Sequence, residues 1–130
     1  MRAVFGSAVL GLALLTGTAC GSSAPTCQDA SRELLGLVAA APTGGELQAV
    51  AGKTLQSPDD ENLHLVVAKV KGKDGVERVG VWTTSHLGNE GEILSVDAVA
   101  KKLTSYGDAA QAATEIGPDD AVTADVRKCL

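Results

Sequence analysis

Apolar and polar residues alternate most clearly along residues 63–73 and 76–85. Alternation of this kind is typical of β-strands, in which successive side chains point to opposite faces of a sheet. Asp74 and Gly75 separate the two runs, and an Asp-Gly pair favours a two-residue type I′ turn. The pattern therefore predicts a β-hairpin.

The length of the predicted turn fixes which side chains share a face, because a shift of one residue moves every side chain to the other face. A two-residue turn places Val70 opposite Val79, on a face that we expect to form the core. It places Val67 opposite Trp82 on the reverse face, where lysines also lie. The reverse face is therefore mixed in character.

The apolar residues of this reverse face are Leu65, Val67 and Trp82. If no helix covers them, they form an exposed apolar patch, and patches of that kind often mark binding sites. Alternatively, residues 46–55 or 87–91 cover Trp82 and make it part of the core. We take the three residues as a candidate binding patch.

Apolar residues recur at helical spacings of three and four on both sides of the hairpin. A short run at residues 92–95 predicts a third strand beside it. We therefore expect an α+β fold, in which a three-stranded antiparallel β-meander is packed on one face by N- and C-terminal helices. The predicted helical segments are residues 27–41, 46–55, 97–106, 108–116 and 119–129.

The beginning of the chain differs from the rest. Met1 and Arg2 precede an uncharged apolar run at residues 3–15. This run is shorter than the roughly 20 residues that a membrane-spanning helix needs, and small residues follow it. We therefore interpret residues 1–19 as a signal peptide, with an uncleaved transmembrane anchor as the alternative.

The end of this leader, LTGTAC at residues 15–20, resembles the lipobox of bacterial lipoproteins. In that family, signal peptidase II cleaves just before the cysteine, which carries acyl chains such as palmitate. The resemblance implies that Cys20 is lipidated and holds the protein on the extracytoplasmic face of the cell membrane. Gly17 departs from the pattern, because a larger aliphatic residue is usual there. The alternative is a secreted protein released by type I cleavage after Ala24, which Pro25 would obstruct.

The chain has three cysteines, and an odd number in an exported protein leaves one without a partner unless it has a separate role. With Cys20 assigned to the lipid, Cys27 and Cys129 remain as a pair that an oxidising compartment allows to form a disulfide. Closing a loop of about 100 residues gains roughly 4–5 kcal/mol in the chain-entropy model. Two unpaired buried thiols are the alternative. The predicted organisation is a lipidated flexible tether at residues 20–26 and a single α+β domain at residues 27–130.

A second resemblance involves VGVWTTS at residues 79–85 and GEILSVDAVAKKL at residues 91–103. Small exported proteins of actinobacteria carry a similar stretch, often with a late cysteine. No activity is assigned to that family. The resemblance therefore implies export and a related fold, and it adds nothing about chemistry.

Few residues suggest chemistry. His64 and His86 are the only histidines, and the predicted register places them on opposite faces of the hairpin, which argues against a shared metal site. The sequence contains no nucleophile elbow and no Gly-rich phosphate loop, so we predict neither catalysis nor a bound cofactor. The acidic groups at residues 59–61 and 119–120 lack the ligand spacing of an EF-hand loop, so a solvated loop and a helix start explain them.

The formal charge of the chain is −5, and removal of Arg2 with the leader makes it one unit more negative. We do not expect such an acidic module to bind nucleic acid, which requires a basic footprint. A basic strip nevertheless lies at the predicted hairpin tip, formed by Lys69, Lys71, Lys73 and Arg78. This strip either contacts anionic lipid or a partner, or is a solvated edge that discourages aggregation.

Together these observations predict a non-catalytic lipoprotein of the cell envelope. It would be attached to the membrane through its lipid anchor and act as a binding or accessory module with a protein partner there. One alternative is a small envelope hydrolase that uses His64 or His86. Another is a purely structural or immunity-type surface protein.

Overall fold

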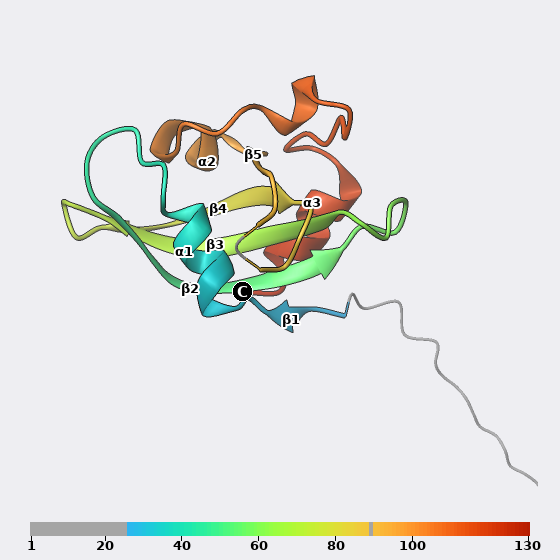
Figure 1. The fold of residues 1–130 in the computed structure, drawn as a ribbon, viewed down its shortest axis with the longest axis horizontal. Coiled ribbons are helices and arrows are strands. Elements are labelled where there is room, and N and C mark those ends of the chain that lie inside the picture. The colour runs from blue at the N-terminus through green and yellow to red at the C-terminus, as the bar shows by residue number, and fades with distance from the viewer. Residues whose placement is uncertain (1–25, 89) are drawn as a thin grey trace, which may run out of the picture.

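The computed structural model describes residues 26–88 and 90–130, which form one antiparallel sheet with helices on both faces (Figure 1). The strand order β1-β2-β3-β4-β5 places each strand beside its neighbour in sequence. The strands are β1 (Gln28–Asp29), β2 (Leu47–Gln56), β3 (His64–Gly72), β4 (Glu77–Thr84) and β5 (Ile93–Ser95). The helices are α1 (Arg32–Val38), α2 (Ala98–Leu103), the short 3-10 helix η2 (Ala109–Gln111) and α3 (Ala121–Arg127).

The predicted α+β class and the antiparallel meander are confirmed, and the predicted third strand is β5. The prediction of three strands is wrong, because β1 and β2 extend the sheet beyond β3 to five strands. Across the residues that the structure describes, no helix has the length and apolar character needed to cross a membrane.

Strand β2 replaces the helix predicted at residues 46–55. A β-bulge between Ala49 and Ala51 leaves Val50 without a partner on β3, and this extra residue disrupts the alternation that identifies a strand in sequence. Gly52 lies beneath α1, where an added Cβ would stand 2.7 Å from a methyl carbon of Leu35. A larger residue here would force the Leu35 side chain to shift and would press on the carbonyl of Val67 at 3.0 Å.

The helix predicted at residues 27–41 begins later than expected. Residues 28 and 29 form β1 and pair with Thr54 and Lys53 of β2. Ser31 is the N-cap of α1, and its Oγ accepts a hydrogen bond from the backbone N–H of Leu34 at 3.1 Å. Strand β1 therefore replaces the first turn of the predicted helix.

The β3–β4 hairpin is confirmed, but its turn contains three residues instead of two. The N–H of Gly75 donates to the carbonyl of Gly72 at 2.9 Å, and Gly72 in turn pairs with Val76. Gly75 has a φ of +76°, whereas Asp74 has no positive φ, so a type I turn followed by a left-handed residue replaces the predicted type I′ turn. The extra residue shifts the register by one, and Val66, not Val67, lies opposite Trp82.

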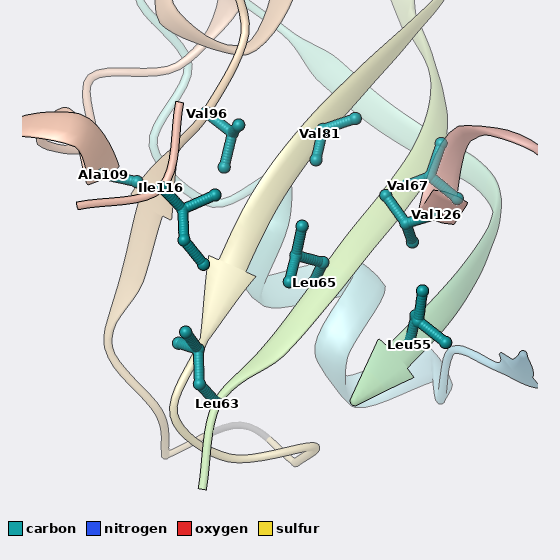
Figure 2. Close-up of a cluster of buried hydrophobic side chains, with 9 residues drawn as sticks. All are labelled: Leu55, Leu63, Leu65, Val67, Val81, Val96, Ala109, Ile116 and Val126. Atoms are coloured by element: carbon teal, nitrogen blue, oxygen red, sulfur yellow. The ribbon is translucent and has the colours of Figure 1, made fainter. Parts of the chain in front are cut away.

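This register gives each face of the sheet its own core, so the prediction of helices on one face only is wrong. Helices α1 and α2 cover one face and α3 covers the other (Figure 1). The α3-side core contains Leu55, Leu63, Leu65, Val67, Val81, Val96, Ala109, Ile116 and Val126 (Figure 2). The opposite core contains Leu34, Val38, Val66, Ala68, Val70, Trp82, Ile93 and Ala100.

Asp97 connects the elements of the C-terminal half. It is the N-cap of α2, and its Oδ1 accepts hydrogen bonds from the N–H of Ala100 at 2.9 Å and of Val81 at 3.2 Å. Its Oδ2 pairs with Arg127 of α3 at 3.2 Å. One buried carboxylate therefore joins β4, α2 and α3. Of the helix predicted at residues 108–116, only the single turn η2 forms.

Gly80 provides a test of the packing beneath Trp82. An added Cβ would lie 2.8 Å from Cη2 of the buried indole and 3.3 Å from the backbone nitrogen of Ala100. We expect Gly80→Ala to lower the free energy of unfolding by about 1–3 kcal/mol, measured by urea denaturation, because neither neighbour can move freely.

Gly36→Ala is the matched control. Gly36 lies in α1 with nothing within 4 Å of an added Cβ, so this change should stabilise the helix by about 0.5–1 kcal/mol. A Gly80→Ala protein as stable as the wild type would contradict the described packing.

Candidate binding surfaces

The predicted binding patch does not form. Leu65, Val67 and Trp82 all have 0% exposure. Leu65 and Val67 belong to the α3-side core, whereas Trp82 belongs to the core beneath α1 and α2. The one-residue change in register separates them, so the three residues share neither a face nor a surface.

Trp82 is a structural residue with its polar atom satisfied. Its Nε1 donates a hydrogen bond to Oγ1 of Thr104 at 2.9 Å. That hydroxyl donates in turn to the carbonyl of Ala100 at 2.7 Å and lies 3.2 Å from Oγ of Ser95. The alternative that Trp82 lies in the core is therefore correct, and its core contains residues of α1 and α2 together with Leu47 and Ala49 from the suggested segment 46–55.

The two histidines lie near one end of the sheet in different surroundings. His64 is half-buried at the start of β3 opposite Thr84, and its Nδ1 is buried without a hydrogen-bond partner among the described residues. His86 follows β4 in an exposed loop, with Nδ1 3.3 Å from Oγ of Ser85. Burial lowers the pKa of His64, which favours the neutral imidazole. In residues 26–88 and 90–130, no group of three or more His, Cys, Asp or Glu side chains could hold a metal ion.

The structure brings together acidic groups that are distant in sequence. Asp59 and Asp60 lie across a hollow of about 520 Å³ from Glu115 and Asp120. Two of these carboxylates serve local turns, because Asp60 accepts from the N–H of Asn62 at 2.9 Å and Asp120 accepts from the N–H of Gly117 at 2.7 Å. We call Asp59, Asp60, Glu61, Glu115, Asp119 and Asp120 the acidic end.

Two open grooves lie near the start of β2. One, of about 670 Å³, runs between α1 and β2 and includes Arg32, Gly36 and Val50 in its walls. The other, of about 500 Å³, separates residues 42–46 from the hairpin turn. Within the described chain, β1 pairs only with Lys53 and Thr54, so the first half of β2 has no strand along its outer edge.

The predicted basic strip is divided between the two faces of the sheet. Lys69 pairs with Val79, and Lys71 pairs with Glu77, on the face that carries α3. Arg78 pairs with Val70 on the other face and forms an ion pair with Asp74 at 3.1 Å. The residues on or beside the first face are the half-buried Lys69 and Lys71 and the exposed Lys73, Val76 and Val79, and we call these five the hairpin-end surface.

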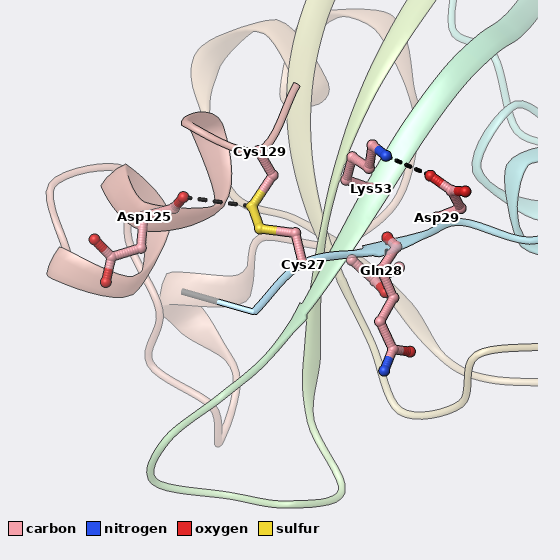
Figure 3. The surroundings of a disulfide bond; sticks show 7 residues. Cys27, Gln28, Asp29, Lys53, Asp125 and Cys129 are labelled. Carbon is pink, nitrogen blue, oxygen red and sulfur yellow. Dashed lines mark hydrogen bonds and ion pairs between the residues drawn. A yellow bond between two sulfur atoms is a disulfide. The ribbon is translucent and has the colours of Figure 1, made fainter. Parts of the chain in front are cut away.

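The Cys27–Cys129 disulfide is present as predicted, with the two Cα atoms 6.0 Å apart (Figure 3). Both cysteines are half-buried and pack against the α3-side core. Cys27 immediately precedes β1, and Cys129 follows α3, where its sulfur lies 3.6 Å from the backbone oxygen of Asp125. Cys27 is predicted to lie within the helix at residues 27–41, but it lies in the segment that leads into β1.

The fold and its surfaces define a small, disulfide-closed α+β module with open grooves at one end. No family model, curated protein or solved structure matches the chain. The predicted signal peptide, the lipidation of Cys20 and all of the tether except Thr26 lie outside the described residues.

Removal of the disulfide should destabilise the fold. The bond joins residues 102 positions apart, and loss of such a cross-link typically costs about 2–5 kcal/mol. We expect this decrease for Cys27→Ala/Cys129→Ala in the free energy of unfolding, measured in urea. Cys20→Ser is the control and should leave the unfolding midpoint unchanged. Equal stability of the double variant and the wild type would contradict a stabilising role.

His64 should make stability depend on pH. Burial lowers the pKa of His64 in the folded protein, so below about pH 6.5 the unfolded chain binds more protons than the folded one. The free energy of unfolding therefore decreases as the pH falls from about 6.5 toward the pKa of His64 in the folded protein. In urea unfolding at about pH 7.5 and about pH 5, His64→Gln should lose less stability than the wild type.

The matched control for this comparison is His86→Gln, which changes an exposed ring. It should keep the wild-type difference between the two pH values. An unchanged difference in His64→Gln would show that burial of this imidazole does not contribute.

Proposed function

We propose that this protein is a cell-envelope lipoprotein, anchored through an acylated Cys20, whose folded domain is a non-catalytic binding or accessory module. The observation that carries the proposal is the Cys27–Cys129 disulfide. It engages two of the three cysteines, and the remaining one ends the lipobox-like LTGTAC segment. Each of the three cysteines then has a role.

An extracytoplasmic location is supported by the same bond. Disulfides form and persist in oxidising compartments and are rare in the cytosol of mesophiles. A basic residue and an apolar run precede Cys20, and the folded body begins only a few residues after it. This order of leader, cysteine, short tether and domain is that of a lipoprotein, and the resemblance to exported actinobacterial proteins agrees with it.

A binding role is supported by the surfaces at one end of the sheet. Two grooves of about 670 and 500 Å³ flank the start of β2, and the exposed Val50 lies in the wall of the larger one. Clefts with apolar walls and a few polar groups are the usual form of binding sites. We assign a partner in the envelope to these two grooves.

The anchor is tested by intact-mass analysis of the full-length protein recovered from its own host. We expect a chain that begins at Cys20, carries acyl chains on that residue, and is two hydrogens lighter because of the disulfide. Cys20→Ser should remain unprocessed and unacylated. Affinity capture of the same anchored material would also report its envelope partner.

Two results would overturn the anchor. One is an unmodified Cys20 thiol in the recovered protein, and the other is cleavage after Ala24. Either would leave the disulfide-closed domain intact while removing its attachment to the membrane.

A further inference from the structure

Acidic and basic side chains gather at opposite ends of the sheet. The acidic end lies where β2 turns into β3, together with the segment that precedes α3. The hairpin-end surface lies at the opposite end of the same strands, where β3 turns into β4. Figure 1 shows these two turns at opposite ends of the sheet. At the hairpin end the three lysines and Arg78 outnumber Asp74 and Glu77, so this end carries an excess of positive charge on a chain with net negative charge.

The lysines of the hairpin-end surface are available for an external partner. Among the described residues, no carboxylate lies within the 4.0 Å ion-pair limit of the Lys69 or Lys73 ammonium group. Lys71 has only a distant partner, the Glu77 carboxylate at 4.0 Å. By contrast, Lys53 in the adjoining part of the sheet is paired with Asp29. Positive charge is thus unbalanced at this surface.

Exposed apolar side chains accompany these lysines. Val76 is 48% exposed and Val79 is 43% exposed. Val79 is the direct cross-strand neighbour of Lys69, so an apolar and a cationic side chain lie together on one face. Apolar groups beside lysines with long aliphatic stems are typical of surfaces that lie in a lipid headgroup region.

The tether allows this surface to reach the membrane. From Cys20 to Cys27 the chain spans seven residue steps, or at most roughly 25 Å. Gln28 pairs with Thr54, which pairs with Val66. Cys27 lies one residue nearer the acidic end than that row. Lys69, Lys71 and Lys73 lie roughly 13, 20 and 26 Å from Cys27 along the strand direction and about 10 Å across the sheet, so an extended tether lets them meet the membrane when the sheet is inclined to it. The tether also joins a cysteine that packs on the same face of the sheet as these lysines.

We propose that the hairpin-end surface docks on anionic phospholipid headgroups of the membrane that holds the anchor. Docking turns the acidic end away from the bilayer and leaves the α1–β2 groove beside the membrane. This inference rests on the proposed attachment at Cys20. Each lysine near an anionic surface strengthens binding by roughly fivefold, so the surface acts on a domain that the tether already keeps close.

The experiment attaches the mature chain chemically to vesicles, by coupling the Cys20 thiol to a maleimide lipid. Omitting residues 1–19 removes no described element, and the coupling does not depend on natural acylation. Trp82 is the only tryptophan, so energy transfer from it to dansyl-labelled headgroups reports how close the domain lies to the bilayer. Vesicles of phosphatidylcholine alone are compared with vesicles that contain phosphatidylglycerol.

We expect higher transfer efficiency on the anionic vesicles, falling to the neutral-vesicle value at high salt. Lys69→Gln/Lys73→Gln should lower the docking equilibrium on the order of 20-fold, the product of two such contributions. Arg32→Gln/Lys128→Gln is the matched control: both residues are exposed, lie outside the hairpin-end surface and change the charge equally. It should dock as the wild type does. Melting temperatures establish that both variants are folded.

Equal transfer on the two kinds of vesicle, or equal loss in both double variants, would overturn the docking surface. Transfer that rises with protein density on neutral vesicles would assign the surface to a second copy of the chain and would also overturn it. Neither result bears on the natural acylation of Cys20, which the mass measurement decides separately. Conversely, an unmodified Cys20 in the native protein would remove the anchor even if the coupled protein docked.

Discussion

The register of β3 against β4 is the constraint on which the rest of the structure depends. Three residues, Lys73, Asp74 and Gly75, form the turn, and the positive φ of Gly75 returns the chain in line with its partner strand. Side chains of a strand alternate between faces, so this register sends Trp82 toward α1 and α2 and sends Val67 toward α3. Each helix layer then has an apolar surface to cover. A turn one residue shorter would exchange the two sets.

Contacts between distant segments hold the C-terminal half to this sheet. Asp97 is 6% exposed and accepts hydrogen bonds from β4 and α2 while it pairs with Arg127 of α3. A charge so nearly buried is stable only when it is paired and hydrogen-bonded. The short α3 helix also depends on Val126 in the core and on the disulfide that follows it. Side-chain contacts, not helix length, keep α3 in place.

Much of the fold could be predicted from local sequence. Alternation revealed β3 and β4, helical spacing revealed α2, and the odd number of cysteines indicated the disulfide partners. β2 was predicted as a helix because a bulge at Val50 and a packing glycine at Gly52 interrupt its alternation. Both features arise from tertiary contacts, with β3 and with α1. Sequence spacing alone does not reveal them.

The candidate binding patch was also misplaced, because its position depends on the register of β3 against β4. Asp74-Gly75 suits a two-residue turn and also the three-residue turn that forms, and apolar residues occur at both odd and even positions of β3. Such a strand, covered on both faces, does not specify its register by alternation. The apolar patch was therefore misplaced. The basic strip was found because lysines crowd the turn in sequence, but the division of its members between faces required the correct register.

The long span of the disulfide has a consequence for biogenesis. Its two cysteines flank nearly all of the described fold, one before the first strand and the other after the last helix. Cys27 leaves the ribosome early, yet it has no correct partner until Cys129 has also been synthesised. The cross-link therefore cannot form until Cys129 has been synthesised, so it closes the domain only after every described strand and helix is present.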